Sequence, residues 1–94
     1  MANGLARQQK LVNSLFSLTV YRLLDKDDLY AAIPMYEQLK KILRLLKTRN
    51  LTYSLEGDVK RLGNLITFSK RNQTDAIKKL LAQPFSFNGQ LKYM

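Results

Sequence analysis

The stretch that decides the fold is residues 28–48, DLYAAIPMYEQLKKILRLLKT. Its apolar side chains recur at alternating steps of three and four residues, the spacing of a helix face that packs in a bundle. Pro34 interrupts the pattern. Because it lacks a backbone N–H, we expect a kink there or a separate short helix before it. The stretch predicts a helix from Asp28 to Thr48 with a seam of Leu29, Ala32, Tyr36, Leu39, Leu43 and Leu46.

Further segments on both sides also carry helical patterns. Apolar residues at helical spacing predict a first helix over about 5–24 and a third over about 55–71. A short fourth helix is expected over about 72–83, with Pro84 ending it. Gly63 lies inside the third helix, where glycine costs about 1 kcal/mol relative to alanine. We expect it to let a neighbouring helix approach closely.

The predicted fold class is all-α, a small antiparallel bundle of three long helices and one short helix. It forms a single domain over residues 1–94, with 84–94 as a C-terminal tail. The tail alternates apolar and polar residues on both sides of Asn88-Gly89, a dipeptide that favours a type I′ hairpin turn. We therefore expect the tail to be extended or to form a hairpin, with its aromatic residues packed on the bundle or on a partner.

The charge is distributed unevenly along the chain. The net charge is +9, and 46% of the residues are hydrophobic, a composition typical of a folded protein. Residues 1–37 carry four basic and four acidic side chains, whereas residues 38–94 carry twelve basic and three acidic ones. The whole excess therefore lies in the second segment. This asymmetry predicts an acidic partner, which could be nucleic acid, an anionic membrane or an acidic protein.

The sequence does not indicate catalysis by a reactive side chain. The chain has no histidine and no cysteine, which removes the commonest general base, the preferred zinc ligands and the usual nucleophile pairs. The run DKDD (25–28) is expected to cap the second helix through Asp25 or Asp27, because no further oxygen ligands follow at metal-site spacing. We expect no enzyme, no catalytic residue, no metal site and no cofactor.

Basic residues on the second and third helices are the strongest functional signal. Lys40, Arg44 and Lys47 share one helix face, and a polar stripe containing Asn64 and Thr67 follows the third helix. If these helices pack antiparallel, both stripes join into a single surface that can neutralise phosphates. The candidate nucleic-acid-binding residues are Lys40, Lys41, Arg44, Lys47, Arg49, Lys60, Arg61, Lys70, Arg71, Lys78 and Lys79.

An ordinary solvated bundle face could carry the same charges. Only Glu37 lies among the basic residues of the second helix as a counter-charge, which favours binding over that alternative. No helix-turn-helix or RNP signature is present, so we expect sequence-tolerant contacts to the nucleic-acid backbone. A membrane-lying helix would turn its bulky apolar face outward, and here the core needs that face.

The expected setting is the cytoplasm. The longest uncharged run, 11–21, is too short and too polar to span a bilayer, and no signal peptide is expected. In size, helicity and clustered charge the chain resembles the small subunit of CRISPR effector complexes. That resemblance implies backbone binding to nucleic acid, together with protein partners, in a ribonucleoprotein assembly.

A second resemblance rests on three segments. RLGNLITF (61–68), KDDLYAAI (26–33) and FNGQLKYM (87–94) are similar to segments of enterocin A-like bacteriocin immunity proteins, which are cytoplasmic four-helix bundles. The connection between the third and fourth helices is shorter here than in that family. This resemblance implies an alternative function in immunity, with Phe85, Phe87 and Tyr93 of the tail meeting a membrane receptor complex.

Overall fold

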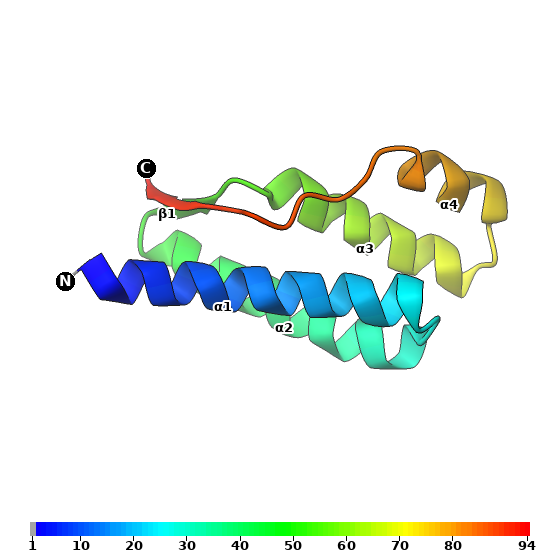
Figure 1. Cartoon of the computed structure of the whole chain (residues 1–94), viewed down its shortest axis with the longest axis horizontal. Helices are drawn as coiled ribbons and strands as arrows, with labels where there is room; N and C mark the ends of the chain where they lie inside the picture. The colour runs from blue at the N-terminus through cyan, green and yellow to red at the C-terminus, as the bar shows by residue number, and fades with distance from the viewer. Residues whose placement is uncertain (1) are drawn as a thin grey trace.

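The computed structural model describes residues 2–94, with side chains from Gly4 onward. It confirms an all-helical fold of three long helices and one short helix with an extended C-terminal tail (Figure 1). The molecule measures 45 × 22 × 20 Å. Its elements are α1 (Ala2–Val20), a π-helical turn η1 (Tyr21–Asp25), α2 (Leu29–Thr48), β1 (Leu51–Tyr53), α3 (Glu56–Lys70), α4 (Thr74–Leu81) and β2 (Leu91–Tyr93).

The long helices run up and down, and the tail fills the position beside α1 and α3. In Figure 1, α1 and α2 form an antiparallel pair, α3 returns alongside α2, and α4 folds back against α3. Because α4 is short, it does not run the length of the bundle. The tail does so instead: Phe85 packs on Phe16 of α1, with ring centroids 5.8 Å apart, and the Ser86 N–H donates to Asp58 of α3 at 3.2 Å.

The predicted seam of α2 faces the interior. Ala32, Leu39 and Leu46 are buried, and the other three seam residues are half-buried against the same core. α1 contributes Val12 and Phe16, and α3 contributes a further buried set. The side chains that are almost completely buried are Val12, Phe16, Thr19, Leu39, Leu62 and Leu65. The heptad spacing read from the sequence is therefore the spacing of the core.

The start of α2 differs from the prediction in two details. Asp28 caps the helix by accepting the Ala31 N–H at 3.1 Å, whereas Asp25 or Asp27 was expected to do so. α2 is one helix from Leu29 to Thr48, so a separate helix before Pro34 is not formed. Pro34 is exposed and lies in the second turn, where its missing N–H leaves only one backbone carbonyl without its donor.

The hairpin form of the tail prediction is wrong, and the extended form is correct. β2 pairs antiparallel with β1, the short segment between α2 and α3, in a register that sets Tyr53 opposite Leu91. Neither Asn88 nor Gly89 has the positive φ that a type I′ turn requires. Gly89 serves another purpose, because a Cβ at this position would overlap the ring of Tyr53.

Asn13 of α1 holds the tail from the other side. Its side-chain amide donates to the Gly89 carbonyl at 2.9 Å, and its Oδ1 accepts the Gly89 N–H at 3.0 Å and the Tyr53 hydroxyl. Burial, with the Asp58 carboxylate as a smaller cause, raises the pKa of Tyr53 to about 12. Tyr53 is therefore a neutral hydrogen-bond donor at neutral pH, and the tail is fastened to α1 and β1 together.

Candidate anion-binding surface

α2 and α3 pack closely at one point, and this contact sets the geometry of the surface between them. Gly63 of α3 lies against the Tyr36 side chain of α2, and a Cβ at Gly63 would overlap the Tyr36 hydroxyl. The prediction that Gly63 allows a close approach is therefore confirmed. Because the two helices are antiparallel, later residues of α2 lie beside earlier residues of α3. The basic stripes of the two helices consequently meet.

The first depression on this surface lies on both sides of the Tyr36–Gly63 contact. It encloses about 280 Å³ and is lined by Lys40 and Glu37 of α2 together with Lys60 and Lys70 of α3. Asn64 supplies an exposed side-chain amide there. The Thr67 hydroxyl lines the same depression but already donates to the Gly63 carbonyl at 3.1 Å. Asn64, rather than Thr67, is thus the neutral donor that remains for a ligand.

A second depression continues the surface toward the other end of α2. It encloses about 290 Å³ and is lined by Lys40, Arg44 and Lys47, with Glu56 from the first turn of α3. Lys40 lines both depressions and so joins them. We call the two depressions together the basic surface, defined by Lys40, Arg44, Lys47, Lys60 and Lys70.

The electrostatics of the basic surface favour anions. In the part of the chain with described side chains, the only salt bridge joins Arg61 to Asp58. Glu37 and Glu56 line the two depressions without forming a salt bridge to the five basic residues, which outnumber them. The Lys40 ammonium lies over the Tyr36 ring, 5.5 Å from its centroid. Burial, followed by the nearby Glu37 carboxylate, raises the pKa of the Tyr36 hydroxyl. The Tyr36 hydroxyl therefore stays protonated at neutral pH and adds no negative charge.

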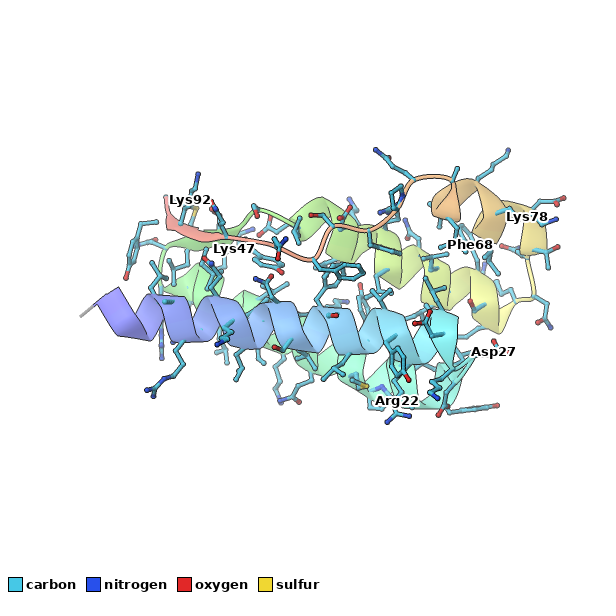
Figure 2. All side chains as sticks on the ribbon, viewed as in Figure 1. Arg22, Asp27, Lys47, Phe68, Lys78 and Lys92 are labelled. Atoms are coloured by element: carbon cyan, nitrogen blue, oxygen red, sulfur yellow. The ribbon has the colours of Figure 1, made fainter. Side chains whose placement is uncertain are left out.

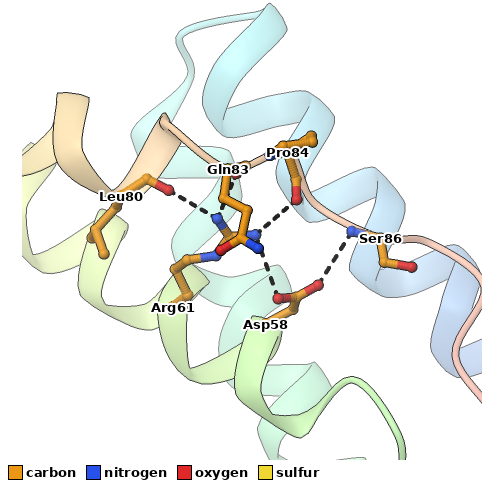
Figure 3. Close-up of polar contacts among 6 residues, drawn as sticks. All are labelled: Asp58, Arg61, Leu80, Gln83, Pro84 and Ser86. Atoms are coloured by element: carbon orange, nitrogen blue, oxygen red, sulfur yellow. Dashed lines mark hydrogen bonds and ion pairs between the residues drawn. The ribbon is translucent and has the colours of Figure 1, made fainter.

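Arg61 has a structural role that the sequence did not indicate. Its guanidinium donates to the carbonyls of Leu80, Gln83 and Pro84 at 2.9, 2.5 and 3.2 Å (Figure 3). It also pairs with Asp58 at 3.4 Å and lies 4.1 Å from the centre of the Phe85 ring. The guanidinium of Arg61 makes its hydrogen bonds to the end of α4 and the start of the tail. Arg61 therefore does not belong to the candidate surface.

The remaining predicted cations do not line the basic surface. Lys41 is exposed on α2, and Arg71 is exposed where α3 ends. Arg49 lines a separate apolar depression between α1 and α2. Lys78 and its neighbour Lys79 are in the last turn of α4, and Figure 2 shows Lys78 at the opposite end of the molecule from Lys47. The structure thus brings together five of the eleven predicted residues.

The aromatic residues of the tail have different degrees of exposure. Phe85 is half-buried beneath Arg61 and against Phe16. Phe87 also contacts Phe16, at 5.9 Å between ring centroids, but 41% of its surface is exposed. Tyr93 pairs with Leu51 in the two-stranded sheet and is 70% exposed. Only Phe87 and Tyr93 are therefore available to a partner while the tail is docked.

The sequence interpretation missed Asn13 and Glu56. Asn13 interrupts the apolar stripe of α1, and a polar residue at such a position was the available signal for a buried hydrogen-bonding role. Glu56 beside Lys40 and Arg44 could not be anticipated without the crossing of α2 and α3.

No helix within residues 2–94 is both long enough and apolar enough to cross a membrane. Comparisons of the chain with protein-family models, with curated proteins and with solved structures return no match.

Proposed function

We propose that the basic surface binds the phosphate backbone of nucleic acid without reading its sequence. The observation that carries this proposal is that Lys40 joins two depressions. Five basic side chains from two helices thereby gather on one face without a salt-bridged carboxylate. Lysine and arginine neutralise phosphates and release counterions, and such contacts do not depend on the bases. A neutral amide, Asn64, lies among them as a further donor to phosphate oxygens.

The length of the basic surface suits a polyanion better than a single acidic group. Lys60 and Lys70 are ten residues apart on α3, which corresponds to about 15 Å of helix. A duplex presents one negative charge per about 1.7 Å of its axis, so several phosphates lie within that span. The chain acts here without catalysis, as a small binding subunit within a larger nucleoprotein assembly.

Salt dependence provides the first test. Contact with about five phosphates predicts that the logarithm of the affinity falls with the logarithm of salt concentration with a slope of roughly −4 to −5 on duplex DNA. Fluorescence anisotropy with duplexes of two unrelated sequences should give the same slope and similar affinities. Binding too weak to measure at about 50 mM salt would refute the proposal.

A matched pair of triple variants provides the second test. Lys40→Glu/Lys60→Glu/Lys70→Glu removes three residues of the basic surface. Lys41→Glu/Lys78→Glu/Lys79→Glu makes the same change in net charge at exposed residues outside it. We expect the first variant to lose at least about 100-fold more affinity than the second, since local contacts dominate over net charge. Equal losses would show that only the overall charge of the protein attracts the nucleic acid.

One observation supports the alternative immunity function that the second resemblance implies. Phe87 and Tyr93 are exposed on the docked tail and could contact a receptor. If this function holds, expression in a bacteriocin-sensitive host should protect it, and Phe87→Ser/Tyr93→Ser should remove protection without unfolding the chain. Protection that survives both changes would rule out the tail as the recognition element.

A further inference from the structure

An apolar groove runs along the exposed side of α1, away from the basic surface. It consists of two adjoining depressions of about 490 and 520 Å³ that share Ser17 and Phe87. One wall is α1 with its π-helical turn, and the other is the end of α4 with the start of the tail. In Figure 1 these walls are the C-terminal half of α1 and the segment that leads from α4 into the tail.

Five of the ten exposed large hydrophobic residues in the described part of the chain line this groove. Each of the five is between 37% and 52% exposed, and the half-buried Phe85 lines the groove with them. They come from three parts of the chain: α1 with its π turn, α4, and the tail. A contiguous apolar surface of this kind is characteristic of an interaction site. The five residues are Leu18, Tyr21, Leu24, Leu81 and Phe87.

The π-helical turn positions three of the residues that line the groove. Within Tyr21–Asp25 the helix widens, and the Lys26 N–H donates to the Tyr21 carbonyl five residues earlier at 3.1 Å. The turn buries Leu23 in the core while Tyr21, Leu24 and Asp25 line the groove. The turn is the last turn of the first helix, and Asp28 and α2 follow it after a short bend.

The charged residues in the groove lie at its two ends. Lys10 lines one end and Asp25 lines the other, and no other charged side chain of residues 4–94 contributes to the lining. Lys26 lies over the Tyr21 ring, 5.6 Å from its centroid, but does not line the groove. Between the ends, Ser14 and Ser17 are small enough to let another helix come close to α1. The groove therefore combines exposed apolar side chains with small neutral polar ones and is oppositely charged at its ends.

We propose that this groove binds an amphipathic α-helix of a partner protein, antiparallel to α1. The first turn of that helix carries a lysine or arginine that pairs with Asp25, and its last turn carries a carboxylate that pairs with Lys10. Its positive N-terminal end then lies beside Asp25 and the C-terminal end of η1, which the helix dipoles favour. Lys10 and Asp25 are fifteen residues apart and so are separated by about 22 Å along the helix, which sets the partner helix at about four turns.

The lining chemistry favours a helix over a lipid surface. Asp25 lines one end of the groove, and Asp27 and Asp28 follow it closely in the sequence, so this end would repel an anionic membrane. Hydroxyl and amide groups of Ser14, Ser17 and Asn88 would remain without partners against acyl chains. The inference is independent of the proposed function, because the groove lies between α1 and α4 whereas the basic surface lies between α2 and α3.

Selection from a peptide library tests this proposal. A display library of helical peptides of about 16 residues is selected on the full-length chain, and selected peptides are measured by fluorescence anisotropy. We expect them to share an apolar stripe at helical spacing with a basic residue in the first turn. Leu18→Glu should weaken binding at least about tenfold, whereas Leu45→Glu, at a comparably exposed position on α2, should leave binding unchanged.

Further measurements distinguish a partner helix from a lipid surface in the groove. Asp25→Lys should remove the preference for a basic first turn, and circular dichroism should show the peptide gaining helicity on binding. The proposal fails if selection yields no binder, or if the selected peptides bind the Leu18→Glu variant equally well. It also fails if anionic phosphatidylserine vesicles, rather than peptides, bind in a manner that Leu18→Glu abolishes.

Discussion

At the scale of single residues, two tight contacts explain why particular side chains are required. Gly63 makes room for the Tyr36 hydroxyl, and Gly89 makes room for the Tyr53 ring. The role of Gly63 could be predicted, because a glycine inside a helix needs a packing reason to offset its cost. The role of Gly89 could not, since Tyr53 lies far from it in sequence and the local pattern indicated a turn instead.

Gly63→Ala should destabilise the fold despite the higher helix propensity of alanine. The added methyl group overlaps the Tyr36 side chain, and overpacking of this kind costs about 1–3 kcal/mol. Adding Tyr36→Phe removes the overlapping hydroxyl, so urea denaturation of the double variant should recover part of the lost free energy of unfolding. Additive effects of the two substitutions would contradict the contact.

The raised pKa of Tyr53 predicts that the folded chain loses stability at alkaline pH. Its pKa is about 12 in the folded state, above the ordinary value near 10, so between these values the folded chain binds more protons than the unfolded chain. The free energy of unfolding should therefore be fully retained below about pH 10 and fall as the pH rises toward 12. In Tyr53→Phe this fall should be smaller by roughly 2 kcal/mol, measured by urea denaturation across that range.

At the scale of elements, the helices could be predicted and the pairing of the tail could not. Periodicity places α2 because its seam extends over most of a helix of 20 residues. β1 and β2 are three residues each, too short to leave a recognisable pattern, and they pair across forty positions of sequence. The partners of Arg61 are backbone carbonyls, which any sequence provides, so nothing in the residues around it distinguishes Arg61 from Lys60.

Adjacent basic residues on α3 should consequently respond in opposite ways. Arg61→Lys keeps the charge but loses the planar fork that contacts α4 and the tail, so it should reduce the free energy of unfolding by about 1–3 kcal/mol. Nucleic-acid affinity should stay within about twofold of wild type. Lys60→Gln should weaken that affinity and leave the stability unchanged. Reversed outcomes would assign the phosphate contacts to Arg61.

At the scale of the whole molecule, the basic surface and the apolar groove lie on different pairs of elements. The basic surface lies between α2 and α3, and the apolar groove lies between α1 and α4. The charge excess of residues 38–94 is evident in the sequence. Which of these basic side chains lie on one surface could not be predicted, because that depends on how the helices cross. Lys78 and Lys79 belong to the same excess yet lie on α4.

This separation predicts where a bound duplex should perturb the chain. In a two-dimensional nitrogen–proton NMR titration with a short DNA duplex, amide shifts should concentrate in residues 40–47 and 60–70, which carry the basic surface. The amides of residues 10–25, which form one wall of the groove, should move little. Shifts centred on α4 would place the duplex on Lys78 and Lys79 instead.

The fastening of the tail also has a consequence for folding kinetics. Its hydrogen bonds to Asn13 and Gln9 join residues 76 and 82 positions apart, whereas the contacts within the helices are local. Contacts between distant residues require the closure of long loops, and proteins rich in them fold more slowly. We therefore expect the helices of this chain to form early and the closure of the tail over Phe16 to be the slower step that completes the native state.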